Sequence, residues 1–209
     1  MSYNIDGILV ATSNPGKIIE LKTCLGSELK WLSLADFYEI SEITEDGSTF
    51  AENARKKASG YARATGCWTI ADDSGLVIDA LDGAPGVNSA RFSGEKLIGE
   101  DRTLIDHRNI AKVLELLRDV PKDKRTARFV CSLCMASPEK ILLETQGTLE
   151  GFIMDREIGT NGFGYDPIFY VPDLKKTVAQ LSAEEKNSIS HRGAAIRKLK
   201  PLLNQLLRE

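Results

Sequence analysis

The sequence predicts an α/β fold with a central, partly antiparallel sheet. Short apolar runs typical of buried strands alternate along the chain with helical patterns, in an order that favours a mixed sheet flanked by helices. No repeat, low-complexity tract or linker rich in Pro, Gly and Ser interrupts this order. We therefore expect one domain over residues 1–209.

The N-terminal part supplies a strand and a helix. An apolar run at residues 8–11 predicts the strand, and Asn14 with Pro15 suits the cap and first turn of the helix that follows. The apolar face of this helix consists of Ile18, Leu21 and Leu25. Further along, Thr49 and Glu52 match a capping box and open a second helix, expected to end near Ala64.

The middle of the chain predicts further strands and a helix. Residues 68–71 are typical of a short buried strand, and three more strands are expected at 128–136, 141–144 and 148–153. A helix between these strands must end before Pro121. Its apolar stripe is expected to consist of Leu104, Ala111, Leu114 and Leu117.

The C-terminal part predicts two helices. Ser182 and Glu185 form a second capping box, and the last helix begins near His191. Pro201 lies inside this last pattern, so we expect it to kink or split the helix.

Composition excludes several classes of function. The net charge of −3 argues against a nucleic-acid-binding surface, which usually carries a strongly basic patch. No apolar run approaches the roughly 18 residues needed to span a bilayer, so no membrane association is expected. The first residues lack the basic start and apolar stretch of a signal peptide, which favours a cytoplasmic enzyme.

Cys131 and Cys134 have the spacing of a C-x-x-C pair but fall in a predicted strand. Residues three apart in a strand point to opposite faces, so the two sulfurs cannot readily share a metal or a disulfide. Cys24 and Cys67 are isolated and do not complete a zinc site. We expect all four to be reduced, the paired ones in the core.

The stretch Ala71-Asp72-Asp73-Ser74-Gly75-Leu76 places two carboxylates and a hydroxyl where an apolar run meets a glycine turn. Carboxylates at the end of a buried strand are costly unless they are paired or bind a cation, and Mg²⁺ prefers such oxygen ligands. The alternative is a surface turn that closes a hairpin.

Two glycine-containing loops suggest contacts to a nucleotide. Thr12-Ser13-Asn14-Pro15-Gly16-Lys17 lies between a strand and a helix, where backbone N–H groups and the helix dipole favour a phosphate, although it lacks the spacing of a Walker A loop. Gly159-Thr160-Asn161-Gly162-Phe163-Gly164-Tyr165-Asp166-Pro167 combines glycines with aromatic rings that can stack on a base. An ordinary capped turn and a structural turn are the respective alternatives.

Lys186, His191 and Arg192 form a basic cluster near a predicted helix start, for which a solvated surface is the alternative. His107 lies in a charged run and is expected at the surface.

Taken together and in this order, the segments resemble the inosine triphosphate pyrophosphatase family over residues 9–199. Besides the motifs at 11–17, 71–76 and 162–167, the resemblance rests on Thr49-Phe50-Ala51-Glu52-Asn53-Ala54, Gly83-Ala84-Pro85-Gly86-Val87 with Ser89-Ala90-Arg91, and Ser190-His191-Arg192-Gly193. It implies an elongated mixed α/β domain with two lobes around a central cleft, usually a homodimer. The implied reaction is Mg²⁺-dependent hydrolysis of deaminated purine nucleoside triphosphates (ITP, dITP, XTP) to the monophosphate and pyrophosphate, which cleanses the nucleotide pool.

The resemblance also implies site residues. Residues of the first loop would hold the triphosphate: Thr12, Ser13, Asn14, Pro15, Gly16 and Lys17. Asp73 would bind Mg²⁺ and activate the attacking water with Asp72 and Ser74 beside it, while Lys17 would stabilise charge in the transition state. Residues expected around the base and sugar are Phe163, Gly164, Tyr165, Asp166, Lys186, His191 and Arg192.

One departure concerns the second acidic metal ligand, which the family draws from a pair of acids before the Gly-x-Thr-Phe element. Here Thr44 replaces the first acid, so Glu45 is the candidate. A related pyrophosphatase for pyrimidine nucleotides, a non-catalytic nucleotide sensor and a single-strand nucleic-acid module are the competing interpretations. The Ser-His-Arg and Phe-Gly-Tyr-Asp elements weigh against a pyrimidine pyrophosphatase. The presence of Asp73 and Lys17 weighs against a non-catalytic sensor, and the net charge weighs against a nucleic-acid module.

Overall fold

A computed structural model describes residues 7–12, 14–26, 29–37, 40–94 and 101–208. These residues form two compact units, each made from separate stretches of chain. Unit 1 comprises residues 1–73, 131–147 and 191–209, and unit 2 comprises 74–130 and 148–190, in each case where described. The expectation of one domain with two lobes around a cleft stays a prediction.

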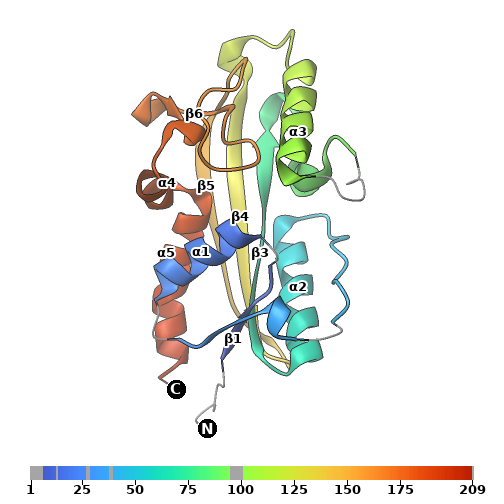
Figure 1. Cartoon of the computed structure of the whole chain (residues 1–209), viewed down its shortest axis with the longest axis vertical. Helices are drawn as coiled ribbons and strands as arrows, with labels where there is room; N and C mark the ends of the chain where they lie inside the picture. The colour runs from blue at the N-terminus through green and yellow to red at the C-terminus, as the bar shows by residue number, and fades with distance from the viewer. Residues whose placement is uncertain (1–6, 13, 27–28, 38–39, 95–100, 209) are drawn as a thin grey trace. The chain divides into compact units, whose positions relative to one another are not determined.

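The fold is α/β, as predicted, with a seven-stranded mixed sheet and flanking helices (Figure 1). The strands are β1 Ile8–Val10, β2 Trp31–Ser33, β3 Trp68–Ile78, β4 Thr126–Ala136, β5 Ile141–Ile153, β6 Phe169–Val171 and β7 Lys176–Thr177. The α-helices are α1 Pro15–Leu25, α2 Phe50–Thr65, α3 Arg102–Leu116, α4 Ala183–Ile189 and α5 His191–Leu206. Short 3-10 helices occupy Leu34–Asp36, Asp79–Leu81, Gly86–Arg91, Lys122–Lys124, Pro172–Leu174 and Val178–Gln180.

The strands hydrogen-bond in the order β2-β1-β3-β4-β5-β6-β7. β1 pairs in parallel with both β2 and β3, whereas β6 pairs antiparallel with β5 and β7. β3, β4 and β5 each contribute residues to both units. Two strands were expected at 141–144 and 148–153. The structure has one continuous strand there, β5, with Gly147 inside it. Gly147 is needed there because a Cβ at this position would lie 2.2 Å from the His191 carbonyl oxygen.

The sheet of unit 1 has helices on both faces, and alternate strand residues separate two cores. α1 and α5 pack on one face, together with Ile70 and Cys131. α2 packs on the other face, together with Ala71 and Cys134. The two cysteines thus point to opposite faces as predicted, and burial raises the pKa of each thiol to about 12. Both stay inert, reduced core side chains.

The core of unit 2 is formed by α3 and the strand segments of that unit. Phe129 of β4 and Phe169 of β6 stack with their ring centroids 4.3 Å apart. The predicted helix is present as α3, and half of the predicted stripe is confirmed. Leu117 is buried and Leu114 packs against this core, whereas Ala111 is exposed and Leu104 is 59% exposed. The buried residues within α3 are Ile105, Asp106, Asn109, Ile110 and Val113.

Caps agree with most of the predicted helix ends. Asn14 caps α1, Thr49 caps α2, and Ser182 with Glu185 forms a complete capping box on α4. α2 ends at Gly66 in the left-handed conformation (φ 73°), which favours glycine. Pro201 does not split α5, which continues through it to Leu206. A proline removes only one backbone hydrogen bond, and apolar packing of Leu199 and Leu203 on both sides of Pro201 holds the helix together.

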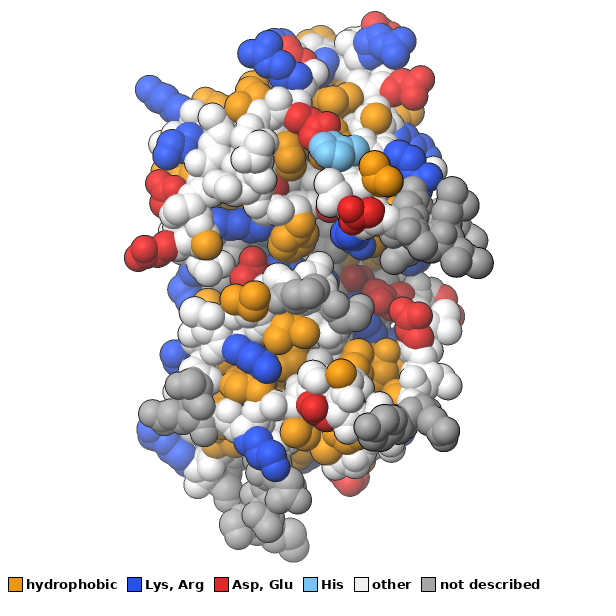
Figure 2. All heavy atoms as spheres, viewed as in Figure 1, with side chains coloured by type: hydrophobic (Ala, Val, Ile, Leu, Met, Phe, Trp, Pro, Cys, Tyr) orange, Lys and Arg blue, Asp and Glu red, His pale blue; other side chains and the backbone are white. Residues whose placement is uncertain are grey.

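None of the helices in the described part of the chain is long and apolar enough to cross a membrane. On the face drawn in Figure 2, acidic and basic side chains are interspersed.

Candidate active site

β3 carries the two consecutive carboxylates, and it does not turn after them. The strand continues from Trp68 to Ile78, so the predicted turn at Ser74 and Gly75 is wrong, and so is the alternative of a surface hairpin turn. Ser74 follows directly in the strand as a half-buried residue of unit 2. The strand can continue because ionic and hydrogen-bonding partners from neighbouring helices satisfy both carboxylates.

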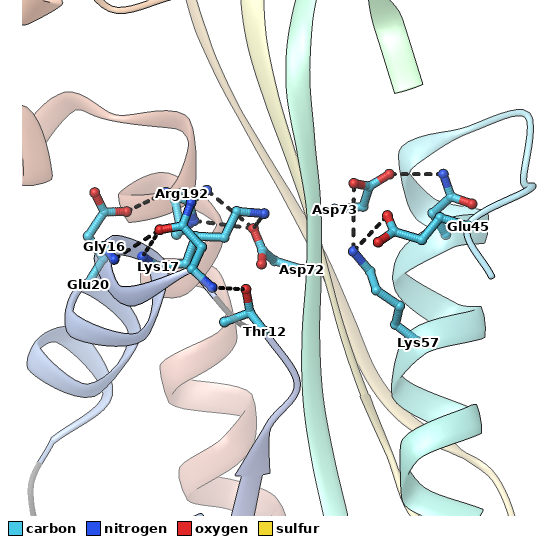
Figure 3. A network of polar contacts seen from close by, with 11 residues as sticks. Thr12, Gly16, Lys17, Glu20, Glu45, Lys57, Asp72, Asp73 and Arg192 are labelled. Atoms are coloured by element: carbon cyan, nitrogen blue, oxygen red, sulfur yellow. Dashed lines mark hydrogen bonds and ion pairs between the residues drawn. The ribbon is translucent and has the colours of Figure 1, made fainter. Parts of the chain in front are cut away.

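Asp72 points toward α1 and α5 and is almost completely buried (Figure 3). One of its oxygens, Oδ2, lies 2.9 Å from Lys17 Nζ and 3.2 Å from Arg192 Nη2. Arg192 is equally buried and pairs through Nη1 with Glu20 of α1. Two cations and two carboxylates therefore form one network that joins α1, β3 and α5.

The charges of this network support one another. Burial by itself would raise the pKa of Asp72, but Lys17, Arg192 and Lys57 outweigh it and hold the pKa well below its usual range. Burial likewise opposes the charged form of Arg192, and Asp72 and Glu20 still raise its pKa. Asp72 and Arg192 are thus both ionised over the physiological pH range.

The loop before α1 is organised by Asn14. Its Oδ1 accepts hydrogen bonds from the N–H groups of Gly16 (2.9 Å) and Lys17 (3.4 Å), and its own N–H donates to Thr12 Oγ1 (3.2 Å). Pro15 is the first helical residue. The predicted phosphate-binding residue Ser13 lies outside the described residues. The structure thus brings Lys17 and the start of α1 to the Asp72 side of β3.

Asp73 points to the opposite face, toward α2 (Figure 3). Its Oδ2 accepts a hydrogen bond from Asn53 Nδ2 at 3.1 Å, and its Oδ1 lies 3.8 Å from Lys57 Nζ. Lys57 Nζ also donates to Glu45 Oε2 at 2.9 Å. The two predicted metal ligands, Asp73 and Glu45, therefore face one lysine amine.

The charge balance at this face differs from that around Asp72. Burial raises the pKa of Asp73, and Glu45 adds to the rise, while Lys57 and Asn53 hold the pKa partly down. Burial opposes the charged form of Lys57, but nearby Asp72, Asp73 and Glu45 outweigh it and raise its pKa. Asp73 is consequently a more basic carboxylate than Asp72, which suits it to accept a proton.

Among the described residues, no three acidic, His or Cys side chains are grouped closely enough to enclose a metal ion. Asp73 and Glu45 offer a pair of carboxylates instead. This donor set fits Mg²⁺, which often takes only one or two protein carboxylates and completes its octahedron with water and phosphate oxygens.

In unit 2, the glycine-rich loop is fastened by Asp166. Its Oδ2 accepts hydrogen bonds from Phe163 N (3.0 Å) and from Lys186 Nζ (2.7 Å), and the Lys186 amine lies 4.3 Å from the centre of the Phe163 ring. Gly162 has a φ of 82°, and a Cβ there would lie 2.1 Å from Asp166 Oδ2. Glycine is thus required for the loop to close on this carboxylate.

Other groups of the loop already have partners. Tyr165 is buried in the apolar core of unit 2, its hydroxyl donates to Ser89 O at 2.9 Å, and burial raises its pKa. The N–H of Gly164 donates to Asp106 Oδ2 at 2.7 Å. Phe163 is half-buried, so it is the aromatic ring of this motif with an accessible part.

The basic cluster is not a solvated surface. Lys186, His191 and Arg192 are each less than 10% exposed. Lys186 belongs to unit 2, whereas His191 and Arg192 begin α5 in unit 1. His107 is exposed as predicted and contacts Glu157.

Three residues of the two networks were not predicted as site residues: Glu20, Asn53 and Lys57. Asn53 and Lys57 lie one turn apart on the face of α2 that also buries Ala54 and Tyr61. Polar residues at helical spacing on an otherwise apolar face were the available signal. Glu20 offered no comparable signal, because it lies on a half-exposed part of α1.

The sequence of the chain matches one protein family and relatives that share about half of its residues. The model of the Ham1 family matches residues 8–202. The chain is 51% identical over 195 residues to the dITP/XTP pyrophosphatase of Bacillus cereus, covering 92% of each protein. It is 48% identical over 202 residues to the dITP/XTP pyrophosphatase of Desulforamulus reducens, covering 95% of this chain and 96% of that protein.

The fold of the chain also matches solved structures of proteins with these names. The Ham1 protein of Staphylococcus aureus superimposes with a TM-score of 0.84 at 42% identity, covering 95% of this chain and 98% of that one. A nucleoside-triphosphatase / dITP/XTP pyrophosphatase from Mycobacterium abscessus gives a TM-score of 0.75 at 42% identity, covering 93% and 98%.

Proposed function

The chain belongs to the Ham1 family, and on that premise we propose that it hydrolyses dITP, ITP and XTP to the nucleoside monophosphate and pyrophosphate. The relatives named dITP/XTP pyrophosphatase cover nearly the whole chain, which supports the same activity here. The observation that carries the proposal is Asp73, a carboxylate whose pKa is raised by burial and which lies against Asn53 and Lys57.

The proposed reaction is an attack of water on the α-phosphorus. The water oxygen bonds to phosphorus, the bond to the oxygen bridging the α- and β-phosphates breaks, and pyrophosphate leaves. Asp73 is the proposed acceptor of the proton of the water, because without a bound metal its pKa is raised by burial whereas the pKa of Asp72 is lowered. Lys57 and Asn53 keep the carboxylate oriented for that transfer.

Mg²⁺ is the cofactor we infer, with Asp73 and Glu45 as its protein ligands. When bound, it would neutralise charge that develops on the phosphate oxygens. The carboxylates fit because Lys57 supplies one positive charge against two negative ones at a site where Asp73 is only 7% exposed. A divalent cation would relieve the remaining negative charge.

We place the triphosphate near the start of α1, with Thr12, Asn14, Gly16 and Lys17 as its contacts. The N-terminal end of a helix favours anions, and Lys17 adds a positive charge. In the described structure Lys17 already pairs with Asp72, which holds its amine beside the middle of β3. We also propose that Lys17 stabilises the negative charge that develops in the transition state.

We infer that the base is recognised by its 6-oxo group, which adenine replaces with an amine. Phe163, Asp166, Lys186, His191 and Arg192 are the proposed contacts, on the strength of the resemblance. The N–H groups of Phe163 and Gly164 already donate to carboxylates, so side chains are the better candidates for reading the base. A polar mismatch costs about 1–3 kcal/mol, so one or two contacts would give roughly 10- to 10⁴-fold selectivity.

Release of pyrophosphate from ITP, XTP, dITP, ATP, GTP and dTTP, with and without Mg²⁺, tests this function. We expect the first three to exceed ATP strongly in kcat/KM and the activity to require the metal. Equal hydrolysis of ATP and ITP would contradict the base assignment. Preference for dTTP would favour a pyrimidine pyrophosphatase, and binding without turnover would favour a nucleotide sensor. A homodimer and a cytoplasmic location are proposed alongside, and sedimentation of the purified protein tests the first.

A further inference from the structure

The loop that carries Glu45 is bound along its length by the first two turns of α2. Four consecutive loop residues pair with four helix residues in reverse order. The pairs are Ser48 with Glu52, Gly47 with Asn53, Asp46 with Lys56 and Glu45 with Lys57. α2 therefore determines where Glu45 lies.

Asn53 links this loop to Asp73. Its Oδ1 accepts a hydrogen bond from Gly47 N at 2.7 Å, and its Nδ2 donates to Asp73 Oδ2 at 3.1 Å. The side chain is completely buried. Because one side of the amide only accepts and the other only donates, rotation of the amide by 180° would break both bonds. The two hydrogen bonds therefore hold the Asn53 amide in a single orientation.

Gly47 permits the close approach on which this link depends. A Cβ at Gly47 would lie 2.7 Å from Asn53 Oδ1 and 2.8 Å from Glu52 Cβ. Any larger residue would push the loop away from α2. Its φ lies outside the left-handed region, so space explains the glycine here and backbone conformation does not.

We propose that Asn53 is a positioning residue that holds Glu45 and Asp73 in one fixed arrangement. Lys57, one turn further along α2, contacts both carboxylates directly, and Asn53 adds a link that carries no charge. The inference rests on the proposed function, in which these two carboxylates bind the metal and Asp73 accepts the proton. Outer-shell partners of this kind typically change metal affinity or activity by about 10- to 100-fold when they are replaced.

Two substitutions that leave the net charge unchanged test the two hydrogen bonds of Asn53, one to the loop and one to Asp73. Asn53→Leu has nearly the same shape and removes both bonds. Gly47→Ala keeps the bond from Asn53 to Asp73 and displaces the loop. Asn109→Leu is the matched control, because Asn109 is also a buried helical asparagine with bonds to backbone atoms, in α3 of unit 2.

The first measurement is the affinity for Mn²⁺ without nucleotide, by electron paramagnetic resonance. The second is kcat and KM for dITP, and thermal unfolding of each variant reports its stability. We expect Asn53→Leu and Gly47→Ala to bind Mn²⁺ about 10- to 100-fold more weakly and to lose a similar factor in kcat. KM should stay within about threefold, because the triphosphate contacts at α1 are unchanged.

The positioning role is overturned if Asn53→Leu and Gly47→Ala both keep the Mn²⁺ affinity and kcat of the wild type and lose only stability, as Asn109→Leu should. If Asn53→Leu does not fold, Gly47→Ala decides alone. If the wild type releases no pyrophosphate from dITP, the proposed function fails, and the Mn²⁺ affinities still show whether Asn53 organises the carboxylates.

Discussion

Asp72 and Asp73 are consecutive in β3, yet their carboxylates enter two separate polar networks on opposite faces of the strand (Figure 3). Alternation of side chains along a strand makes this unavoidable once β3 continues through both residues. The first carboxylate lies between Lys17 and Arg192, and the second faces Asn53 and Lys57. The two carboxylates thus have different ionic partners, and the catalytic role proposed above belongs to Asp73 alone.

Asp73→Asn is expected to lower kcat by about 10²- to 10⁴-fold, because an amide cannot accept the proton that the reaction releases. Its shape is retained, so thermal unfolding should change by only a few degrees. Steady-state kinetics with dITP measures the loss. Asp155→Asn is the control, since Asp155 is an exposed aspartate of unit 2 that pairs with Lys122. A variant at Asp73 with wild-type kcat would remove this residue from the mechanism.

Lys17→Ala should raise KM and lower kcat, because contacts to the triphosphate act in both the ground state and the transition state. Lys22 lies on the same helix, in its last turn, and Lys22→Ala should leave both constants unchanged. Comparison of the two variants with dITP separates a local contact from the general charge of α1. Equal effects at both positions would show that only the charge matters.

The pH dependence of stability should identify Asp72 as an ionised, paired carboxylate. Its pKa is lowered in the folded protein, so its contribution to stability is complete above the ordinary pKa of an aspartate and is lost as the pH falls toward the folded value. The difference in unfolding free energy between the wild type and Asp72→Asn should therefore be large at pH 7 and shrink below about pH 4. Urea titrations at pH 7, 5 and 3 measure it, and a difference that is constant with pH would contradict the assignment.

Local patterns in the sequence predicted the elements that depend on neighbours along the chain. Asn14, Thr49 and Ser182 cap their helices because a capping bond spans only two or three residues. The placement of Cys131 and Cys134 on opposite faces was also predictable, because side chains alternate along a strand. The family resemblance is confirmed by relatives that cover most of the chain.

Features that depend on distant partners were not predictable. The turn at Gly75 was wrong because Lys17 and Arg192, far away in sequence, satisfy Asp72 inside a continuing strand. The stripe of α3 was only half right, because Leu104 is exposed while Asn109, a polar residue, is buried through bonds to backbone atoms. The role proposed for Asn53 rests on its simultaneous contact with a loop and a strand.

Arg192→Ala should destabilise the protein strongly. The guanidinium is 1% exposed and pairs with Asp72 and Glu20, so its removal leaves two carboxylates short of a partner in a mostly buried site. Breaking a buried ion pair on one side typically costs about 3–5 kcal/mol, whereas an exposed pair is worth about 0–1 kcal/mol. Because Lys17 still contacts Asp72, we expect a loss near the lower end, about 3 kcal/mol.

Arg55→Ala provides the matched comparison for this loss. Arg55 also pairs with a carboxylate in unit 1, that of Glu144, but its side chain is 51% exposed. We expect it to cost less than about 1 kcal/mol. Arg192→Lys should recover part of the loss, because one amine can replace the charge but cannot reach both carboxylates in the fork geometry of a guanidinium. Urea unfolding at pH 7 measures all three variants. Equal losses for Arg192→Ala and Arg55→Ala would mean that the buried network does not hold α1, β3 and α5 together, and only the proposed contact with the base would then explain Arg192.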